Sequence, residues 1–389
     1  MIKLRTKIDA AFLVFILLLL SLQVGMAVNR TITPTSDNLV LFITDSNGGI
    51  WNATGDDIQL AINNLNSTNG GTVWLPAASL ATTKSILTYD LSIIIEGVGM
   101  GGGSTPSASP VTEIQPTGEW NDYMIKVGLP GTVSYGVVLK NFILDGEDKS
   151  SFLGGIQFLN VWNGRIENVM VDDFFGTSPR AIGINVTSDG ASGSYYNMIV
   201  QPFVRRCTIG IHFGYNSNAN TIQGGIVTNV RNDIQSCGVL IENADTNTII
   251  DTDIEGHDSV NSSGAINIIA STRHSSYNKF FGVRMEGNYI NVNISAGVGA
   301  STGAAKFYGC SASNTGGTNV IDNGDWDSYF HDFTWYNITN LRSVLRLTPR
   351  AVPPTLTIDG MAPSEGMIYA DTDHHLYYYN GTSWLQLDN

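Results

Sequence analysis

The sequence predicts an all-β protein that folds as a parallel β-helix, a solenoid with coils of about 27 residues. Three observations predict it: a short pattern that recurs along the chain, alternating apolar and polar positions within each repeat, and a composition suited to frequent turns. Of 389 residues, 42 are glycine and only 14% are charged. Because glycine, asparagine and serine form turns and disfavour helices, this composition favours short strands joined by tight turns.

The recurring pattern is a small residue, an apolar residue, any residue and a second apolar residue. It occupies residues 155–158, 183–186, 210–213, 238–241 and 265–268, so successive repeats begin 28, 27, 28 and 27 positions apart. A further turn is expected at residues 292–294. Such even steps predict coils that lay each strand on the strand of the coil before. The alternative is an antiparallel β-sandwich with coincidental spacing, whereas a propeller blade would need about 40 residues.

A second strand begins in each repeat at Gly164, Asn197, Asn220, Asn247 and Asn278. Stacked asparagines can satisfy backbone groups that a turn would leave unpaired. Seven positions after each start the residue is apolar, which predicts a column facing the core: Val171, Val204, Val227, Ile254 and Met285. Eight positions after each start the residue is polar, which predicts an outward column: Asp172, Arg205, Thr228, Glu255 and Glu286.

The same alternation predicts a charged patch where two coils adjoin. Asp251, Asp253, Glu255 and His257 are expected to point outward on one strand, and Gly282, Arg284, Glu286 and Asn288 on the next. Neighbouring coils lie about 4.8 Å apart, so Arg284 is expected beside Asp253. The candidate catalytic residues are Asp253, Glu255, Arg284 and Glu286. The candidate substrate-binding residues are Asp251, His257, Asn288, Asp172 and Arg205, with Asp173 and Arg206 extending the column.

The first residues predict export. Basic residues precede an almost wholly apolar run from Ala10 to Leu22, and a small-residue cleavage site ends at Ala27. This arrangement is typical of a secretory signal over residues 1–27, and an uncleaved segment, residues 1–28, would anchor the chain in a membrane.

Three cysteines allow at most one disulfide, and buried free thiols are the favoured interpretation. A net charge of −14 without a basic stripe excludes nucleic acid as a partner.

A stretch in the N-terminal third resembles a known family. "GDDIQLAINNLNSTNGGTVWLPAASL", residues 55–80, is similar to the opening of pectate-lyase-like, right-handed parallel β-helix proteins, although Ala78 stands where that family usually has glycine. The resemblance implies a right-handed, single-stranded β-helix and a short helix that covers the open end of the coils. Asp56 or Asp57 can cap this helix, and Ile58, Ala61, Ile62 and Leu65 make its apolar face.

The C-terminal residues 346–389 are predicted to form a separate, small β-meander, after a β-helix domain over residues 28–345. Two alternating runs, residues 367–370 and 376–379, are followed by an Asn380-Gly381 turn. The segment is similar to modules that end phage tail-fibre and other virion proteins. That resemblance implies a homotrimer.

The fold resemblance leaves three functions open, because this fold hosts lyases, hydrolases, tailspikes and pure binders. The first is a secreted, cell-surface or virion spike-like protein that binds polysaccharide along the helix flank. The second is a polysaccharide lyase or glycoside hydrolase, for which Ca²⁺ is the candidate cofactor. The third is a structural stalk. Asp251, Asp253 and His257 also resemble polygalacturonase fragments, but they share one strand where that family uses successive coils, so its catalytic roles do not carry over. No transition-metal site is predicted.

Overall fold

The computed structural model describes most of the predicted β-helix and part of the C-terminal module. The described residues are 40–42, 54–65, 70–100, 111–118, 120–175, 181–228, 236–258, 264–297, 300–323, 328–332, 334–336, 368–370, 375–380 and 382–386. The chain divides into two compact units, Met1–Arg342 and Ser343–Asn389, and each is described by itself. The predicted export segment, residues 1–27, lies outside the described residues. No helix among the described residues is long and apolar enough to cross a membrane.

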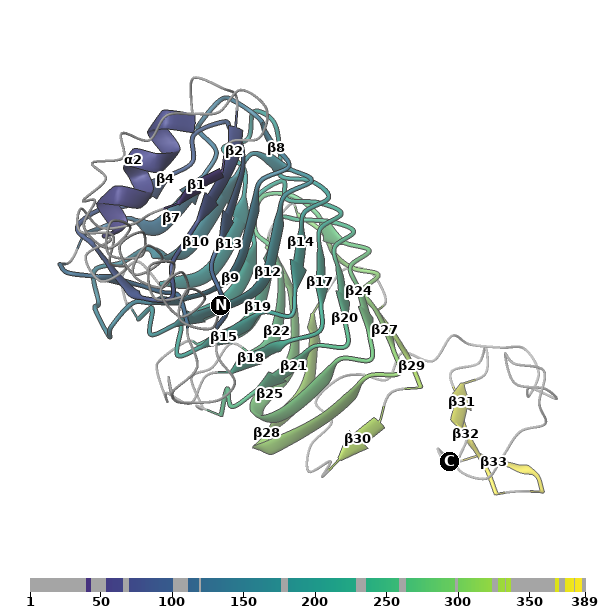
Figure 1. Ribbon diagram of the computed structural model, residues 1–389. Coiled ribbons are helices and arrows are strands. Elements are labelled where there is room, and N and C mark those ends of the chain that lie inside the picture. The colour runs from purple at the N-terminus through teal and green to yellow at the C-terminus, as the bar shows by residue number, and fades with distance from the viewer. Residues whose placement is uncertain are drawn as a thin grey trace, which may run out of the picture. The chain divides into compact units, whose positions relative to one another are not determined.

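The first unit is a parallel β-helix, in which a 26-stranded sheet winds through successive coils (Figure 1). Its strands form three stacks. The first stack contains β1 (Val40–Phe42), β2 (Gly70–Trp74), β5 (Ser92–Glu96), β9 (Val138–Asp145), β12 (Arg165–Asp172), β14 (Met198–Val200), β17 (Thr221–Gln223), β20 (Thr248–Ile250), β24 (Lys279–Phe281), β27 (Lys306–Tyr308) and β29 (Tyr329–His331).

The other two stacks complete each coil. The second contains β3 (Ser79–Thr82), β6 (Glu113–Pro116), the later halves of β9 and β12, β15 (Phe203–Arg205), β18 (Ile226–Thr228), β21 (Asp253–Glu255), β25 (Arg284–Ala296), β28 (Ser311–Asn323) and β30 (Thr334–Tyr336). The third contains β4 (Ile86–Leu87), β7 (Tyr123–Val127), β10 (Gly154–Leu159), β13 (Ile182–Thr187), β16 (Ile209–Phe213), β19 (Cys237–Glu242), β22 (Gly264–Ala270) and the later parts of β25 and β28. Short pairs also join two turns, β8 (Ser134–Tyr135) with β11 (Val161–Trp162) and β23 (Ser275–Ser276) with β26 (Thr302–Gly303).

The predicted repeat is confirmed by the strand register. In the third stack Ile156 pairs with Ile184, Ile184 with Ile211, and Ile211 with Val239. In the second stack the predicted core column, from Val171 to Met285, pairs residue for residue and is buried. Every pairing in this sheet is parallel, so the β-sandwich alternative is wrong.

The predicted asparagine stack is also present at the start of the first-stack strands. The Asn220 side-chain oxygen accepts the backbone N–H of Asn197 at 2.9 Å, and Asn247 does the same for Asn220 at 2.9 Å. Asn278 continues the series by accepting the N–H of Asn247. All four asparagines are buried. Each side chain therefore accepts a hydrogen bond from a turn N–H of the preceding coil. A buried N–H without such a partner would destabilise the fold.

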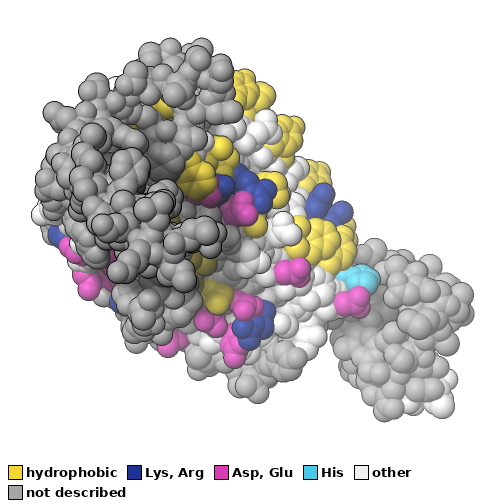
Figure 2. Space-filling model, viewed as in Figure 1, with side chains coloured by type: hydrophobic (Ala, Val, Ile, Leu, Met, Phe, Trp, Pro, Cys, Tyr) yellow, Lys and Arg dark blue, Asp and Glu magenta, His cyan; other side chains and the backbone are white. Residues whose placement is uncertain are grey.

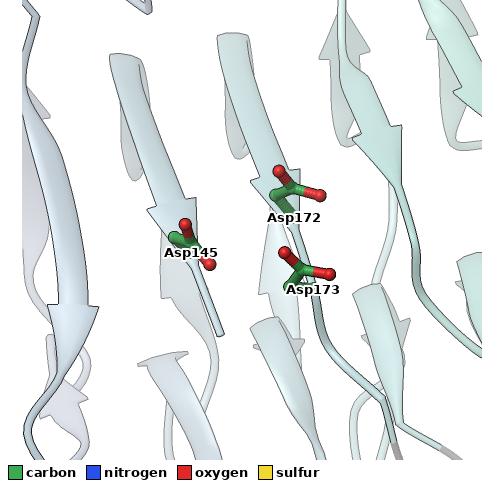
Figure 3. A group of neighbouring side chains, drawn as sticks. All are labelled: Asp145, Asp172 and Asp173. Carbon is green, nitrogen blue, oxygen red and sulfur yellow. The ribbon is translucent and has the colours of Figure 1, made fainter. Parts of the chain in front are cut away.

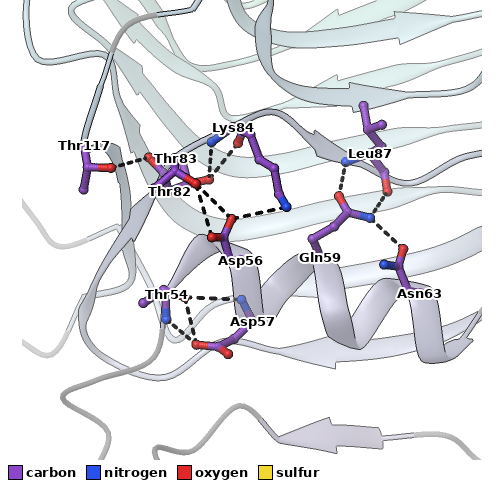
Figure 4. A network of polar contacts seen from close by, with 10 residues as sticks. All are labelled: Thr54, Asp56, Asp57, Gln59, Asn63, Thr82, Thr83, Lys84, Leu87 and Thr117. Atoms are coloured by element: carbon purple, nitrogen blue, oxygen red, sulfur yellow. Dashed lines mark hydrogen bonds and ion pairs between the residues drawn. The ribbon is translucent and has the colours of Figure 1, made fainter.

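A helix covers the N-terminal end of the coils, as predicted. Helix α2 (Gly55–Leu65) buries Ile58, Ala61, Ile62 and Leu65 completely. The predicted cap is wrong in detail, because Thr54 is the N-cap and Asp57 is its partner three residues later. Figure 4 shows this pair and the contacts that hold the helix to the coil below: Asp56 to Thr83 and Lys84, and Gln59 to Leu87.

The second unit contains a three-stranded antiparallel meander. Its strands are β31 (Ile368–Ala370), β32 (Leu376–Tyr379) and β33 (Trp384–Gln386). The Asn380 side chain accepts N–H groups of Thr382 and Ser383 in the predicted turn. The sequence therefore identified this meander correctly. In the first unit Cys207, Cys237 and Cys310 are buried and none of them forms a disulfide, as expected.

Candidate functional site

Arg284 joins the predicted charged patch across two coils. Its Nε and Nη2 donate to the two oxygens of Asp253 at 2.8 and 2.7 Å, and its Nη1 donates to Glu286 at 2.7 Å. The strand register places Asp253 opposite Arg284 and Glu255 opposite Glu286, as the repeat predicted. The hydrogen bonds that Arg284 donates to Asp253, and then the negative charge of Asp253, raise the pKa of the Arg284 guanidinium further. Arg284 is half-exposed, so the patch is a hydrated surface network.

A hollow adjoins this patch on the next coil. Its volume is about 390 Å³. Its lining contains two charged, two hydroxyl and two apolar residues: Arg284, Glu286, Ser311, Ser313, Met285 and Ala312. Met285 and Ala312 are almost completely buried and form its apolar part. A space of this size with convergent polar groups can take a small ligand or one sugar unit.

Two predicted binding residues face the interior instead. His257 is 1% exposed and Asn288 is fully buried, so their predicted outward position is wrong. The cause is Gly256 and Gly287, which adopt φ values of +74° and +66° and break the alternation of the strand. Asn288 accepts the backbone N–H of His257 at 3.0 Å, so it has a structural part in the turn. Asp251 is exposed, as predicted, in the turn before β21.

A buried acidic cluster occupies the N-terminal end of the outward column. Asp145, Asp172 and Asp173 bring carboxylate oxygens within 4.8 Å of one another (Figure 3). Asp172 was predicted to be a surface residue but is 2% exposed. Arg205 and Arg206 shield it: Arg205 Nε donates to Oδ2 at 2.7 Å, and Arg206 Nε donates to Oδ1 at 2.8 Å. Arg206 also contacts Asp173 at 2.7 Å.

The electrostatics of this cluster favour a protonated acid. Burial, and then the nearby Asp172 charge, raise the pKa of Asp173 to about 7. Burial also raises the pKa of Asp145, and the pKa of Glu113 on β6 rises for the same reason and through Asp145. The positive charge of Arg206 acts in the opposite direction on Asp173. A carboxyl group of raised pKa beside a second carboxylate is one feature that sites of general acid–base catalysis share.

The same cluster is a poor calcium site as it stands. Ca²⁺ takes six to eight oxygen ligands. Both oxygens of Asp172 already accept guanidinium N–H groups, and two arginines compensate the negative charge. A cation would have to displace both arginines from Asp172. The expectation of Ca²⁺ therefore finds no support in the donor set of this cluster.

Two further surfaces were not identified from the sequence. Tyr135, Trp162 and Tyr195 lie on neighbouring turns with ring centroids 5.8 and 5.2 Å apart, the first pair edge-to-face and the second tilted. On β24, β27 and β29 a second aromatic column adjoins two lysines. Aromatic residues at equivalent positions of successive repeats were a usable signal, but only the strand register shows which of them share a column.

The fold and these sites define the chain as a parallel β-helix protein. No family model matches the sequence, and no curated protein matches it either. The chain is similar in structure to the N-terminal fragment of bacteriophage phi29 gene product 12, with a TM-score of 0.58 at 12% identity over 83% of this chain and 55% of that one. It is similar to Geobacillus virus E2 ORF18, with a TM-score of 0.52 at 14% identity over 89% and 84% of the two chains.

A third similar structure is the enzymatically active domain of bacteriophage CBA120 tailspike protein 2. The TM-score is 0.51 at 13% identity, over 72% of this chain and 40% of that one. This chain therefore spans about half of the phi29 fragment and less than half of the tailspike domain. At such identities the likeness concerns the fold alone.

Proposed function

We propose that this protein binds polysaccharide along the outer flank of the second stack, as a secreted, cell-surface or virion spike-like protein. The observation that carries the proposal is the outward column itself. Arg205, Thr228, Glu255 and Glu286 lie in register on successive coils, with the Asp253–Arg284 pair beside them. Such a column offers polar groups at about 4.8 Å intervals along the helix axis, which suits an extended chain of hydroxyl-bearing units.

The surface chemistry agrees with a hydrated ligand. Figure 2 shows acidic and basic side chains in small groups on the face it presents, with uncharged and hydrophobic surface between them. Glu255 forms no hydrogen bond or ion pair through its carboxylate with any residue the structure describes, so it is free to accept from ligand hydroxyls. The hollow beside Arg284 and Glu286 gives one position where a sugar unit could be recognised by shape.

A binding assay with a panel of acidic and neutral polysaccharides tests this proposal. The intact protein is expected to retain at least one glycan, and Asp253→Asn together with Glu255→Gln is expected to weaken that binding. The matched control is Asp122→Asn, because Asp122 is a partly exposed carboxylate that lies just before β7 of the third stack and pairs with Lys126 within that strand. Failure of the intact protein to bind any member of the panel would leave the structural stalk as the better function.

A second candidate function, polysaccharide lyase or glycoside hydrolase, is favoured by one observation. Asp173, with its pKa near 7, lies beside Asp145 and Asp172, whereas the predicted catalytic patch holds Arg284 in a hydrogen-bonded network. Hydrolysis of a glycosidic bond uses one protonated and one ionised carboxyl group. Incubation of the protein with each glycan, followed by product analysis, tests it. New reducing or unsaturated ends that vanish in Asp173→Asn would establish catalysis at the buried cluster.

The homotrimer and the export of the chain remain part of the proposal. Light scattering on the intact protein and on a chain that ends before Pro353 tests the oligomeric state. A trimer that falls to a monomer on truncation supports an assembly role for the C-terminal unit, and a monomer in both cases contradicts it. N-terminal sequencing of the exported protein tests cleavage after Ala27.

A further inference from the structure

We propose that the outer surface of β24, β27 and β29 binds the acid groups of an anionic polysaccharide through Lys279 and Lys306. This inference rests on the proposed function, polysaccharide binding. It adds a second binding surface and the charge of the ligand. It is carried by three observations: the two lysines have no ion pair with any described residue, they lie opposite each other in the strand register, and an aromatic column lies next to them.

Lys279 and Lys306 differ from the other lysines that the structure describes. Lys84, Lys126, Lys140 and Lys149 each pair with a carboxylate of a nearby strand, turn or helix: Asp56, Asp122, Glu96 and Glu147. Lys279 and Lys306 form no ion pair with any described residue. In a chain with a net charge of −14, carboxylates are plentiful. Two neighbouring lysines without a carboxylate partner among the described residues are therefore available to bind an external anion.

The strand register places these two lysines directly opposite each other. Lys279 on β24 pairs with Lys306 on β27, and Tyr329 on β29 follows in the same column. Like charges opposite each other on neighbouring strands repel and destabilise the sheet. The Lys306 ammonium lies 5.9 Å from the centre of the Tyr329 ring, a weak contact that leaves most of its charge unbalanced. A carboxylate or sulfate placed between the two lysines would remove this repulsion.

Aromatic rings line the next outward column. Phe281 stacks on Tyr308 with ring centroids 5.1 Å apart and planes 10° from parallel, and His331 follows at 6.0 Å. Because the rings cover each other's faces, their edges point outward, and the edge of an aromatic ring carries partial positive charge. The column therefore offers apolar contact without repelling an anion. Figure 2 shows hydrophobic, basic and histidine side chains close together on this face.

The position of the surface suits a chain that runs along the helix axis. The lysine column and the aromatic column run side by side over the same successive coils. Along the chain, only Gly282 and Val283 separate Phe281 from Arg284 of the proposed flank site. Asp251 and Asp332 border the surface, and Asp332 lies 3.0 Å from His331. Both acids lie beside the aromatic column, two positions or more from the lysine column. Charge complementarity therefore favours an anionic ligand over a second, acidic copy of this chain.

Titration of the intact protein with polygalacturonate tests the inference, with methyl-esterified pectin as the matched ligand that lacks most of the charge. We expect polygalacturonate to bind, the ester to bind more weakly, and added salt to weaken the binding. Lys279→Gln with Lys306→Gln is expected to raise the Kd about tenfold or more. The control is Lys84→Gln with Lys149→Gln, which removes the same charge from lysines that already have partners, and it should leave the Kd unchanged.

The possible results separate the inference from the proposed function. Equal Kd values for the two ligands, or an unchanged Kd in the Lys279/Lys306 double variant, would overturn the inference and leave polysaccharide binding intact. Absence of binding to any glycan would overturn both. A lower mass by light scattering in the same double variant would show that the surface joins copies of the chain, which also overturns the inference. Circular dichroism melts establish that each variant is folded.

Discussion

Arg284 binds both carboxylate oxygens of Asp253 across the boundary between two coils, at 2.8 and 2.7 Å, and uses its remaining nitrogen for Glu286. The pair therefore compensates charge within the predicted site and is itself half-exposed. Arg206 makes a similar set of contacts with Asp172 and Asp173, but in a buried cluster. The two arginines allow the same interaction to be compared at two degrees of burial.

Arg284→Gln is expected to change the free energy of unfolding by less than about 1 kcal/mol, because exposed ion pairs contribute little. Arg206→Gln is expected to cost about 3 kcal/mol or more, because it leaves Asp172 buried with half of its donors. Urea unfolding of the two variants measures both values. Equal costs would contradict the assignment of one pair to the surface and the other to the interior.

Asp173→Asn is expected to flatten the dependence of stability on pH. The pKa of Asp173 is about 7 in the folded protein and near 3.8 when unfolded, so the folded state holds the proton more tightly. The wild-type protein therefore loses this contribution as pH rises from about 4 to 7. The asparagine variant should be more stable than wild type at pH 8, by roughly 1 to 3 kcal/mol, and similar at pH 4.

Asparagine suits position 173 for two reasons. The backbone φ there is +58°, which asparagine tolerates well, and the amide oxygen can still accept from Arg206. Thermal melts at several pH values provide the measurement. A variant that is less stable than wild type at every pH would show that Asp173 is ionised in the folded protein.

His257→Leu is expected to protect the fold against acid. Burial lowers the pKa of His257 to about 3, and neither ring nitrogen has a hydrogen-bond partner among the described residues. The unfolded chain therefore takes up a proton that the folded chain excludes, and stability falls as pH drops below about 6.5, by roughly 1.4 kcal/mol per pH unit. Unfolding at pH 7 and pH 5 tests this. His274→Gln, an exposed histidine, is the control and should retain the wild-type acid sensitivity.

Gly210→Ala is expected to destabilise the coil stack by about 1 to 3 kcal/mol through overpacking. A methyl group at this position would lie 2.4 Å from Val227 and 2.6 Å from the carbonyl oxygen of Gly238 in the next coil. Gly118→Ala is the matched control, since a methyl group there meets nothing within 4 Å. Comparable melting temperatures for the two variants would contradict the close approach of neighbouring coils at Gly210.

The sequence by itself determined the coil and its register. The even spacing of the small–apolar–any–apolar pattern was enough to pair Val171 with Val204 and Asp253 with Arg284, because each coil of a solenoid contacts mainly its neighbours. It also located the capping helix and the C-terminal meander. The export signal, the domain limits at residues 27 and 345, and the trimer stay predictions.

Only the tertiary structure decided which polar residues reach solvent. Alternation holds along a strand, but Gly256 and Gly287 take left-handed conformations that turn His257 and Asn288 inward. Asp172 keeps its predicted column yet is buried, because Arg205 and Arg206 cover it from the following coil. Such burial depends on side chains from several coils at once, as does the absence of a carboxylate partner for Lys279 and Lys306 among the described residues. A repeat pattern gives the position of each residue within its coil, and the packing between coils sets its exposure and charge state.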